Sequence, residues 1–263
     1  MKLGAALTLL LAFTILLSLA WTPYDPIAID LANPLSAPSM AHLLGTDEFG
    51  RDVLSRAMLG GRISALIAAC VVLAAITAGT VLGVVAGTLG GWTDRALMTL
   101  IDAILAFPGI LLALALIAVL GSGSGSIVLA LSIAYLPSVT RVVRGAVLSV
   151  REREYVEASK AAGDGMLYTM VRHVMPNVLP SIIILATSLF GWSLLSESAL
   201  SFLGVGVPPP APTWGNMLSA SRPYMDAAPW LSIVPGLCVA AALLGINLLG
   251  DGLRDRLDPR RPA

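Results

Sequence analysis

The chain has 263 residues, of which 57% are hydrophobic and only 12% are charged, and its mean hydropathy is +0.86. A soluble domain of this size could not bury so much apolar surface, so the composition predicts an all-α polytopic membrane protein. The formal net charge is zero, which argues against a nucleic-acid partner, and Cys70 and Cys238 lie within apolar runs, where buried thiols are expected.

Residues 3–21 form the first apolar run, close to the roughly 20 residues that a helix needs to cross a bilayer. The run ends at Trp21, a residue type that anchors helices at the membrane interface, and this favours a retained membrane helix. A cleaved signal peptide is the alternative interpretation, because Ser18 and Ala20 form a small-residue cleavage pattern.

The next segment, residues 22–61, is polar, contains four prolines and is too short to have a hydrophobic core of its own. Four charged residues cluster there in the sequence GTDEFGRD: Asp47, Glu48, Arg51 and Asp52. We expect a lip on the outer face of the membrane that contacts a delivery protein, or else a purely structural re-entrant turn.

The second span is expected at about residues 63–88. Small residues recur along it and just beyond it at four-residue intervals: Gly79, Gly83, Gly87 and Gly91. Such a ridge lets helix backbones approach closely, and internal packing is favoured over a seam between subunits or along a pore. The third span, at about 96–120, contains Asp102 near its start and Pro108 in its interior. We expect Asp102 to reach water or pair with Arg95, in a structural role.

The fourth span is expected at about residues 127–148, with Arg141 and Arg144 at its far end. The longest polar interval of the chain follows, residues 151–180, and is predicted to form two short helices. Gly163 is placed to end the first of them with a left-handed residue, and Asp164 to cap the start of the second.

The second short helix is predicted to place four apolar residues on one face: Leu167, Met170, Val171 and Val174. Pro176 then ends or restarts the helix, because it lacks a backbone N–H. The first helix is lined by alanine and ends at glycine, so it offers a low-relief surface suited to a groove on another protein. A solvated loop is the alternative.

The fifth span, at about residues 181–203, contains Glu197, the one carboxylate deep within an apolar segment. A charged group at that depth is costly unless it is paired, solvated or protonated. Two roles therefore stay open for Glu197: lining a cavity or gate, or hydrogen bonding within the helix packing. The sixth span is expected at about residues 230–249.

The distribution of basic residues predicts the orientation. With residues 151–180 placed in the cytoplasm, twelve basic residues are inside: Lys2, Arg95, Arg141, Arg144, Arg151, Arg153, Lys160, Arg172, Arg254, Arg256, Arg260 and Arg261. Four are outside: Arg51, Arg56, Arg62 and Arg222. The positive-inside rule then gives six spans with both termini in the cytoplasm. Residues 1–61 form the first membrane helix and its outer loop, and residues 62–263 form a five-helix core.

The polar interval carries a family resemblance. Its sequence Glu157-Ala158-Ser159, followed by Gly163 and then Met175-Pro176, resembles the EAA loop of bacterial ABC importer permeases. In this chain Ser159 stands in place of the second alanine, His173 in place of isoleucine and Met175 in place of leucine.

Three further stretches resemble the dipeptide, oligopeptide and nickel branch of these binding-protein-dependent inner-membrane components. They are HLLGTDEFGRDVLSRAMLGGRIS from His42, ESALSFLGVGVPPPAPTWGNML from Glu197, and NLLGDGLRDRLDPR from Asn247. Together they cover the chain nearly from end to end.

The resemblance implies a permease in the bacterial cytoplasmic membrane that docks onto ATPase subunits through the polar interval. The implied coupling residues are Arg153, Tyr155, Glu157, Ala158, Lys160, Gly163 and Pro176. Glu197 is the candidate for the translocation path. The implied partners are a second homologous permease, two ATP-binding subunits, an extracytoplasmic solute-binding protein and membrane lipid.

The chain has no G-x-x-x-x-G-K-[ST] sequence, so it is not expected to be the ATPase itself. No cofactor is expected on this chain, and ATP and magnesium are expected on the partner subunits. The resemblance favours short peptides as substrates, with nickel or a nickel chelate as the alternative. An ion-coupled secondary transporter is the alternative of another class, although only Asp102 and Glu197 are ionisable candidates for it.

Overall fold

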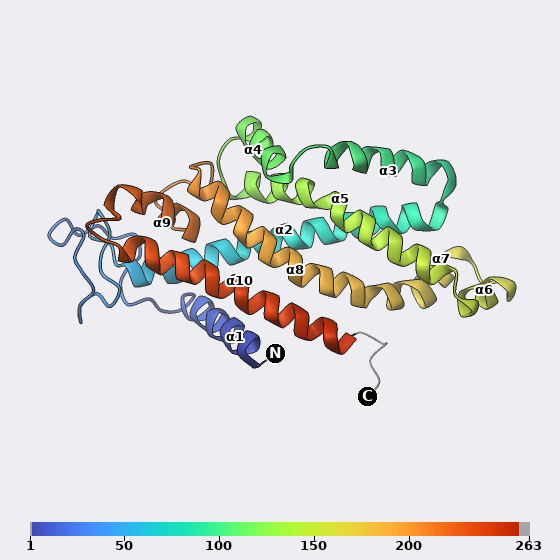
Figure 1. Ribbon diagram of the computed structural model, residues 1–263, viewed down its shortest axis with the longest axis horizontal. Coiled ribbons are helices and arrows are strands. Elements are labelled where there is room, and N and C mark those ends of the chain that lie inside the picture. The colour runs from blue at the N-terminus through green and yellow to red at the C-terminus, as the bar shows by residue number, and fades with distance from the viewer. Residues whose placement is uncertain (1, 258–263) are drawn as a thin grey trace.

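The computed structural model describes residues 2–257, and the regular elements in that range are helices, as the composition predicted. Their bounds are α1 Lys2–Leu17, α2 Val53–Leu89, α3 Gly91–Leu105, α4 Gly109–Leu120, α5 Ser124–Arg151, α6 Glu154–Ala161, α7 Met166–Thr169, the π-helix η1 Met170–Val174, α8 Met175–Phe202, α9 Trp214–Ser221, the 3₁₀-helix η2 Arg222–Tyr224 and α10 Trp230–Leu257. The long helices form a bundle, with α6 and α7 at one end and α9 with residues 22–52 at the other (Figure 1).

The count of six membrane spans is not confirmed. Four helical segments in the described part of the chain are long and apolar enough to cross a bilayer: α2, α5, Met166–Phe202 and α10. The apolar part of α1, Gly4–Leu17, is shorter than a full span. A continuous third span is wrong, because α3 and α4 meet at an angle of 85°. Pro108, the N-cap of α4, lies at this break and cannot continue the hydrogen-bond ladder of α3.

The glycine ridge of α2 is an internal packing surface against α5. A Cβ atom on Gly79 would lie 2.5 Å from Val139 Cγ1, and one on Gly87 would lie 2.8 Å from Val147 Cγ1. Gly91 takes no part, because a Cβ there would have nothing within 4 Å. Internal packing, the favoured interpretation of the ridge, accounts for these contacts, and a larger residue at either packed position would force α2 and α5 apart.

Helix α1 lies along α10 on the side of the bundle opposite α3 and α4 (Figure 1). A Cβ on Gly4 would lie 2.4 Å from Leu248 Cβ, and one on Gly245 would lie 3.0 Å from Thr8 Oγ1. Helix α1 therefore packs closely against α10 but ends at Leu17, and the retention of residues 3–21 as a membrane helix stays a prediction.

Two ion pairs connect α3 to α5. Arg144 donates from Nε and Nη2 to the two carboxylate oxygens of Asp94, and Arg141 Nη2 donates to Asp102 Oδ1 at 2.6 Å. The predicted alternative partner of Asp102, Arg95, is therefore wrong. Helix α5 continues past Arg141 and Arg144 to Arg151, and the location of the two arginines at the end of the membrane span stays a prediction.

Some of the residues that predict the orientation fall outside the described structure. These are the side chains of Lys2 and Arg256 and the whole of Arg260 and Arg261. The orientation of the termini stays a prediction.

Candidate functional site

The candidate docking segment, residues 151–180, begins with the short helix α6. Arg153 is its extended N-cap, and Gly163 follows its last turn with φ +89°, as predicted. The N–H of Gly163 donates to Lys160 O, and the N–H of Asp164 donates to Ser159 O. These two bonds form a Schellman motif, which ends the helix in a fixed geometry. A side chain at Gly163 would meet open space, so glycine is needed there for its backbone angle.

Ser159 connects the two halves of the segment. Its hydroxyl is buried and donates to Asp164 Oδ2 at 2.6 Å, and it lies 3.2 Å from Thr169 Oγ1 on α7. The predicted role of Asp164 as a helix cap is wrong, because Gly165 is the N-cap of α7. Ser159, which stands in place of the second alanine of the EAA pattern, therefore stabilises the turn between α6 and α7 through its hydroxyl group.

The second half of the segment is continuous with the membrane helix that follows, over Met166–Phe202. A π-turn at Met170–Val174 lies within it, where the N–H of Met175 donates to Met170 O. Pro176 follows directly and has no N–H to donate, so the wider turn accommodates its ring. Helix continues past Pro176, so the second half of the docking segment and the membrane helix form one continuous helical element.

The predicted apolar face of this second half is wrong. Met170 and Val174 are buried at 8% and 1% exposure, but Leu167 and Val171 are 77% and 61% exposed. The two exposed residues lie one turn from each other on the outer side of the segment. Their exposure was not predicted, because the prediction assumed regular helical spacing. Pro176, which follows the π-turn, was the signal in the sequence that the helix could be irregular here.

An aromatic cluster supports the segment where its two halves meet. The His173 ring lies 6.4 Å from that of Tyr155 on α6 and 6.0 Å from that of Tyr168 on α7, measured between centroids. Both tyrosines are partly exposed. The rings therefore contribute both to the packing between α6 and the π-turn and to the outer surface.

We define the coupling surface as the exposed residues of this segment. All seven predicted coupling residues are on it: Arg153, Tyr155, Glu157, Ala158, Lys160, Gly163 and Pro176. Exposed apolar side chains extend it: Met166, Leu167, Tyr168 and Val171. The surface lies at the end of the bundle that carries α6 and α7 (Figure 1). It combines an apolar patch with charged side chains, as protein interfaces do.

A cavity of about 470 Å³ lies behind α6, against the turn that joins α2 to α3. Arg151, Lys160 and Asp164 contribute to its lining. At its edge, Arg151 Nη1 donates to Gly87 O at 2.7 Å and ties the end of α5 to α2. Val156, Met170 and Val174 also line this space and belong to the hydrophobic core, so the coupling surface is backed partly by packed core and partly by a cavity of mixed lining.

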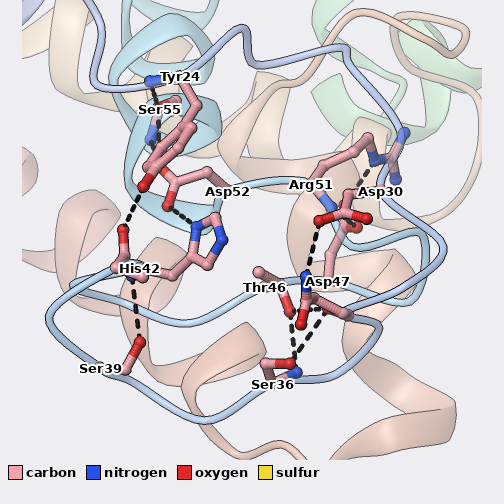
Figure 2. Close-up of polar contacts among 12 residues, drawn as sticks. Tyr24, Asp30, Ser36, Ser39, His42, Thr46, Asp47, Arg51, Asp52 and Ser55 are labelled. Carbon is pink, nitrogen blue, oxygen red and sulfur yellow. Dashed lines mark hydrogen bonds and ion pairs between the residues drawn. The ribbon is translucent and has the colours of Figure 1, made fainter.

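The opposite end of the molecule is the lip, residues 22–52, and its charges are internal (Figure 2). Asp47 is buried, accepts hydrogen bonds from the backbone N–H groups of Phe49 and Arg51, and binds Arg51 Nε at 2.6 Å. Arg56 Nε, on α2, lies 3.2 Å from the same carboxylate. One carboxylate thus organises two guanidinium groups and a backbone turn.

A second group of contacts fastens the lip to the start of α2. Asp52 is the N-cap of α2 and accepts from the backbone N–H of Ser55 at 2.8 Å. His42 Nδ1 lies 3.0 Å from Asp52 Oδ1, and the Tyr24 ring stacks on His42 with centroids 4.6 Å apart (Figure 2). The GTDEFGRD cluster is therefore a folding element, and contact with a delivery protein stays a prediction.

Glu197 is fully buried within α8. Ser201 Oγ donates to its Oε1 at 2.7 Å, and two more buried hydroxyls, of Ser193 and Ser198, lie on the same helix. Thr213, the N-cap of α9, lies near the same carboxylate. This burial supports the packing alternative for Glu197 in the present conformation, at the place where α9 seats on α8.

Comparison with protein families finds a match over residues 79–261 to the family described as "binding-protein-dependent transport system inner membrane component". A protein of Brucella suis biovar 1 (strain 1330) that carries the name peptide permease is 40% identical over 259 residues, 98% of this chain and 86% of its own length. The glutathione transport system permease protein GsiD of Escherichia coli O6:K15:H31 (strain 536 / UPEC) is 40% identical over 262 residues, 99% of this chain and 86% of its own length.

Solved structures show the same fold at low sequence identity. A chain of the inward-facing MetNI methionine ABC transporter matches with a TM-score of 0.58 and 18% identity, covering 76% of this chain and 96% of its own. A chain of an amino acid ABC transporter with histidines matches with a TM-score of 0.54 and 15% identity, covering 73% of this chain and 91% of its own.

Proposed function

This chain belongs to the family of binding-protein-dependent transport system inner membrane components and is an ABC importer permease subunit, and we propose that it carries short peptides across the membrane. Its relatives named for peptide and glutathione transport support this substrate class, because glutathione is itself a short peptide. The observation that carries the importer role is the coupling surface, which is exposed and continuous with a helix long and apolar enough to span the membrane.

The coupling surface would receive the ATPase subunits. Glu157, Ala158 and Gly163 form its centre, with Arg153, Tyr155 and Lys160 at the edges. The exposed side chains Leu167 and Val171 supply an apolar patch that a partner would remove from water.

Movement of this surface would be transmitted to the path of the substrate. When ATP and magnesium draw the two ATPase subunits together, α6 is displaced at the end of α5, and the segment Met166–Phe202 moves as one lever. Pro176 lies within this lever without breaking it. ATP shifts the equilibrium to the extent that it binds the two conformations with different affinity. The hydrolysis occurs on the partners, so this chain supplies no catalytic residue.

The complete transporter would contain this chain, a second homologous permease, two ATPase subunits and a solute-binding protein. With the coupling surface in the cytoplasm, the lip faces the outer side, where the binding protein delivers its substrate. Both termini are then cytoplasmic.

The proposal is tested by reconstituting the complete transporter in proteoliposomes and measuring uptake of radiolabelled alanyl-alanine. We expect uptake that requires the binding protein and ATP hydrolysis, and none with a non-hydrolysable ATP analogue.

Parallel measurements distinguish the alternatives. Uptake of nickel, free or as a histidine chelate, without uptake of peptide would contradict the peptide assignment. Uptake driven by a proton or sodium gradient in the absence of ATP would contradict the importer assignment and favour a secondary transporter.

A further inference from the structure

A second cavity, of about 560 Å³, lies between α1 and α2. The α1 residues that line it recur at helical spacing and share one face of that helix: Thr8, Leu11, Ala12, Ile15 and Leu16. The α2 residues that line it follow the same spacing: Arg62, Ala65, Leu66 and Ala69. The two faces therefore form the walls of a groove that runs along both helices, which we call the α1–α2 groove.

The floor of the α1–α2 groove is apolar and is built by three other helices. It consists of Phe190 and Leu194 of α8, Trp214 of α9, and Ala242 and Ile246 of α10. Leu194 and Trp214 are buried, and the indole N–H of Trp214 donates to Ala57 O at 2.9 Å, which fixes the ring in place. The groove is thus a preformed apolar space between helices.

The length of the α1–α2 groove suits a lipid acyl chain. At a rise of 1.5 Å per residue, its wall extends about 12 Å along α1, from Thr8 to Leu16, and about 10 Å along α2, from Arg62 to Ala69. Half of a bilayer hydrocarbon core is about 15 Å thick. The groove can therefore hold most of one acyl chain within a single leaflet.

Arg62 is the charged residue among the described residues that line the groove. Its side chain is exposed, and it makes no hydrogen bond or ion pair within residues 2–257. An arginine beside an apolar surface lays its aliphatic stem along that surface and keeps its guanidinium at the polar edge. A guanidinium without a partner binds phosphate well, because its N–H groups match the geometry of the phosphate oxygens.

Arg62 lies at the end of the groove that is next to the lip. Helix α1 leads into the lip and α2 begins directly after it, so Arg62 and Leu16 are at the same end (Figure 1). Leu19 also lines this end, and Trp21, two residues further on, is 56% exposed. Tryptophan is enriched where lipid headgroups meet the hydrocarbon core. A cation at one end of an apolar groove is complementary to a phospholipid, which has an anionic phosphate at one end of its acyl chains.

We propose that the α1–α2 groove binds one phospholipid with an anionic headgroup. The guanidinium of Arg62 donates to the phosphate, and one acyl chain lies between the walls of the groove against Phe190 and Ile246. An anionic headgroup is favoured over a zwitterionic one, because none of the described lining residues is acidic and an ammonium group would find no carboxylate there. The site is independent of which substrate the transporter carries.

The first test locates the lipid on the complete transporter. Phosphatidylglycerol with a diazirine in its acyl chain is photo-cross-linked to the transporter in mild detergent, and the labelled residues are identified by mass spectrometry. The intact mass of this chain is measured in the same sample. We expect labels on the wall residues of α1 and α2, and unlabelled phosphatidylglycerol should compete at a concentration about tenfold lower than phosphatidylcholine. Absence of label from both walls, loss of α1 from the chain, or equal competition by the two lipids overturns the proposal.

The second test removes the cation. Arg62→Gln should raise the concentration of phosphatidylglycerol that halves the labelling about tenfold, because a hydrogen bond between charged groups is lost, and Arg62→Lys should raise it less. Arg222→Gln is the control, since the Arg222 guanidinium already lies over the Phe202 ring and donates to Phe202 O. It should leave competition unchanged. Equal competition in Arg62→Gln and the wild type contradicts the assignment of the phosphate to Arg62.

The third test fills the apolar part of the groove. Ala12 and Ala69 line it and are exposed, so a phenylalanine at either position can enter the space without displacing the core. Ala12→Phe and Ala69→Phe should each lower labelling of the opposite wall at least tenfold. The matched controls are Ala6→Phe on α1 and Ala78→Phe on α2, which are exposed outside the groove and should label as the wild type does. Unchanged labelling in Ala12→Phe and Ala69→Phe, with unfolding temperatures equal to that of the wild type, contradicts the seating of the acyl chain between α1 and α2.

Discussion

The two ends of the molecule use charged residues in opposite ways. In the lip, Asp47 and Arg51 are buried and form an ion pair with each other, so their charges stabilise the folded loop. In the docking segment, which we also call the coupling segment, residues 151–180, Glu157 and Lys160 are exposed and form no such ion pair in the described structure. A dense charged motif in the sequence is therefore a poor guide to a binding surface. The GTDEFGRD motif of the lip is the denser of the two, and its charged side chains pair with one another inside the fold.

The difference has a physical reason. The lip has no helix between residues 22 and 52, so its backbone groups depend on side chains such as those of Asp47 and Asp52 for hydrogen bonds. In the coupling segment, helices satisfy the backbone internally and leave the side chains available to a partner. We therefore expect substitutions in the lip to change stability, and substitutions in the coupling segment to change assembly.

Asp47→Ala should have the largest effect on stability. It leaves Arg51 and Arg56 without their shared carboxylate, and breaking a buried pair costs about 3–5 kcal/mol. Thermal unfolding of the purified protein in detergent measures this loss. Glu48→Ala is the control, because Glu48 is farther from Arg51, at 3.3 Å. Equal unfolding temperatures for Asp47→Ala and the wild type would show that the lip does not depend on its internal charges.

Gly163→Ala should have a smaller effect. Its left-handed backbone angle costs a residue with a side chain about 1 kcal/mol, and no neighbour would be displaced. Gly165→Ala is the matched control, because Gly165 has φ −67° and equal space around it. The difference in unfolding free energy between the two variants isolates the cost of the turn. No difference between them would contradict the role assigned to the Schellman motif.

Glu197→Gln should have an effect that is smaller still. The amide keeps the shape of the side chain and an oxygen that accepts from Ser201, so uptake is expected to stay within about twofold of the wild type. Uptake by the reconstituted transporter measures this. A loss of about tenfold or more, with ATPase subunits still recovered, would favour the translocation path over packing for Glu197.

Sequence reasoning recovered the features that local chemistry determines. Apolar length located the four helical segments that can span a bilayer, and Gly163 marked the end of α6. It also identified Pro176 as a point where helix resumes.

Features set by contacts between distant residues were not recovered. Arg141 and not Arg95 binds Asp102, because the bend at Pro108 and the packing of α3 on α5 decide which cation is within reach. The exposure of Leu167 and Val171 follows from a π-turn, which regular helical spacing does not contain. The role of Ser159 required the folded turn, since its hydroxyl binds residues five and ten positions away.

Purification of the assembled transporter in mild detergent tests the central claim most directly, with recovered ATPase subunits quantified by mass spectrometry. Glu157→Lys and Leu167→Asp on the coupling surface are compared with Met40→Asp, an exposed apolar position on the lip. All three should change the unfolding free energy by less than about 0.5 kcal/mol, because the side chains are exposed. We predict that the wild type and Met40→Asp recover the ATPase subunits and that the two coupling-surface variants lose them. Equal recovery with all four proteins would contradict the assignment of residues 151–180 as the ATPase docking site.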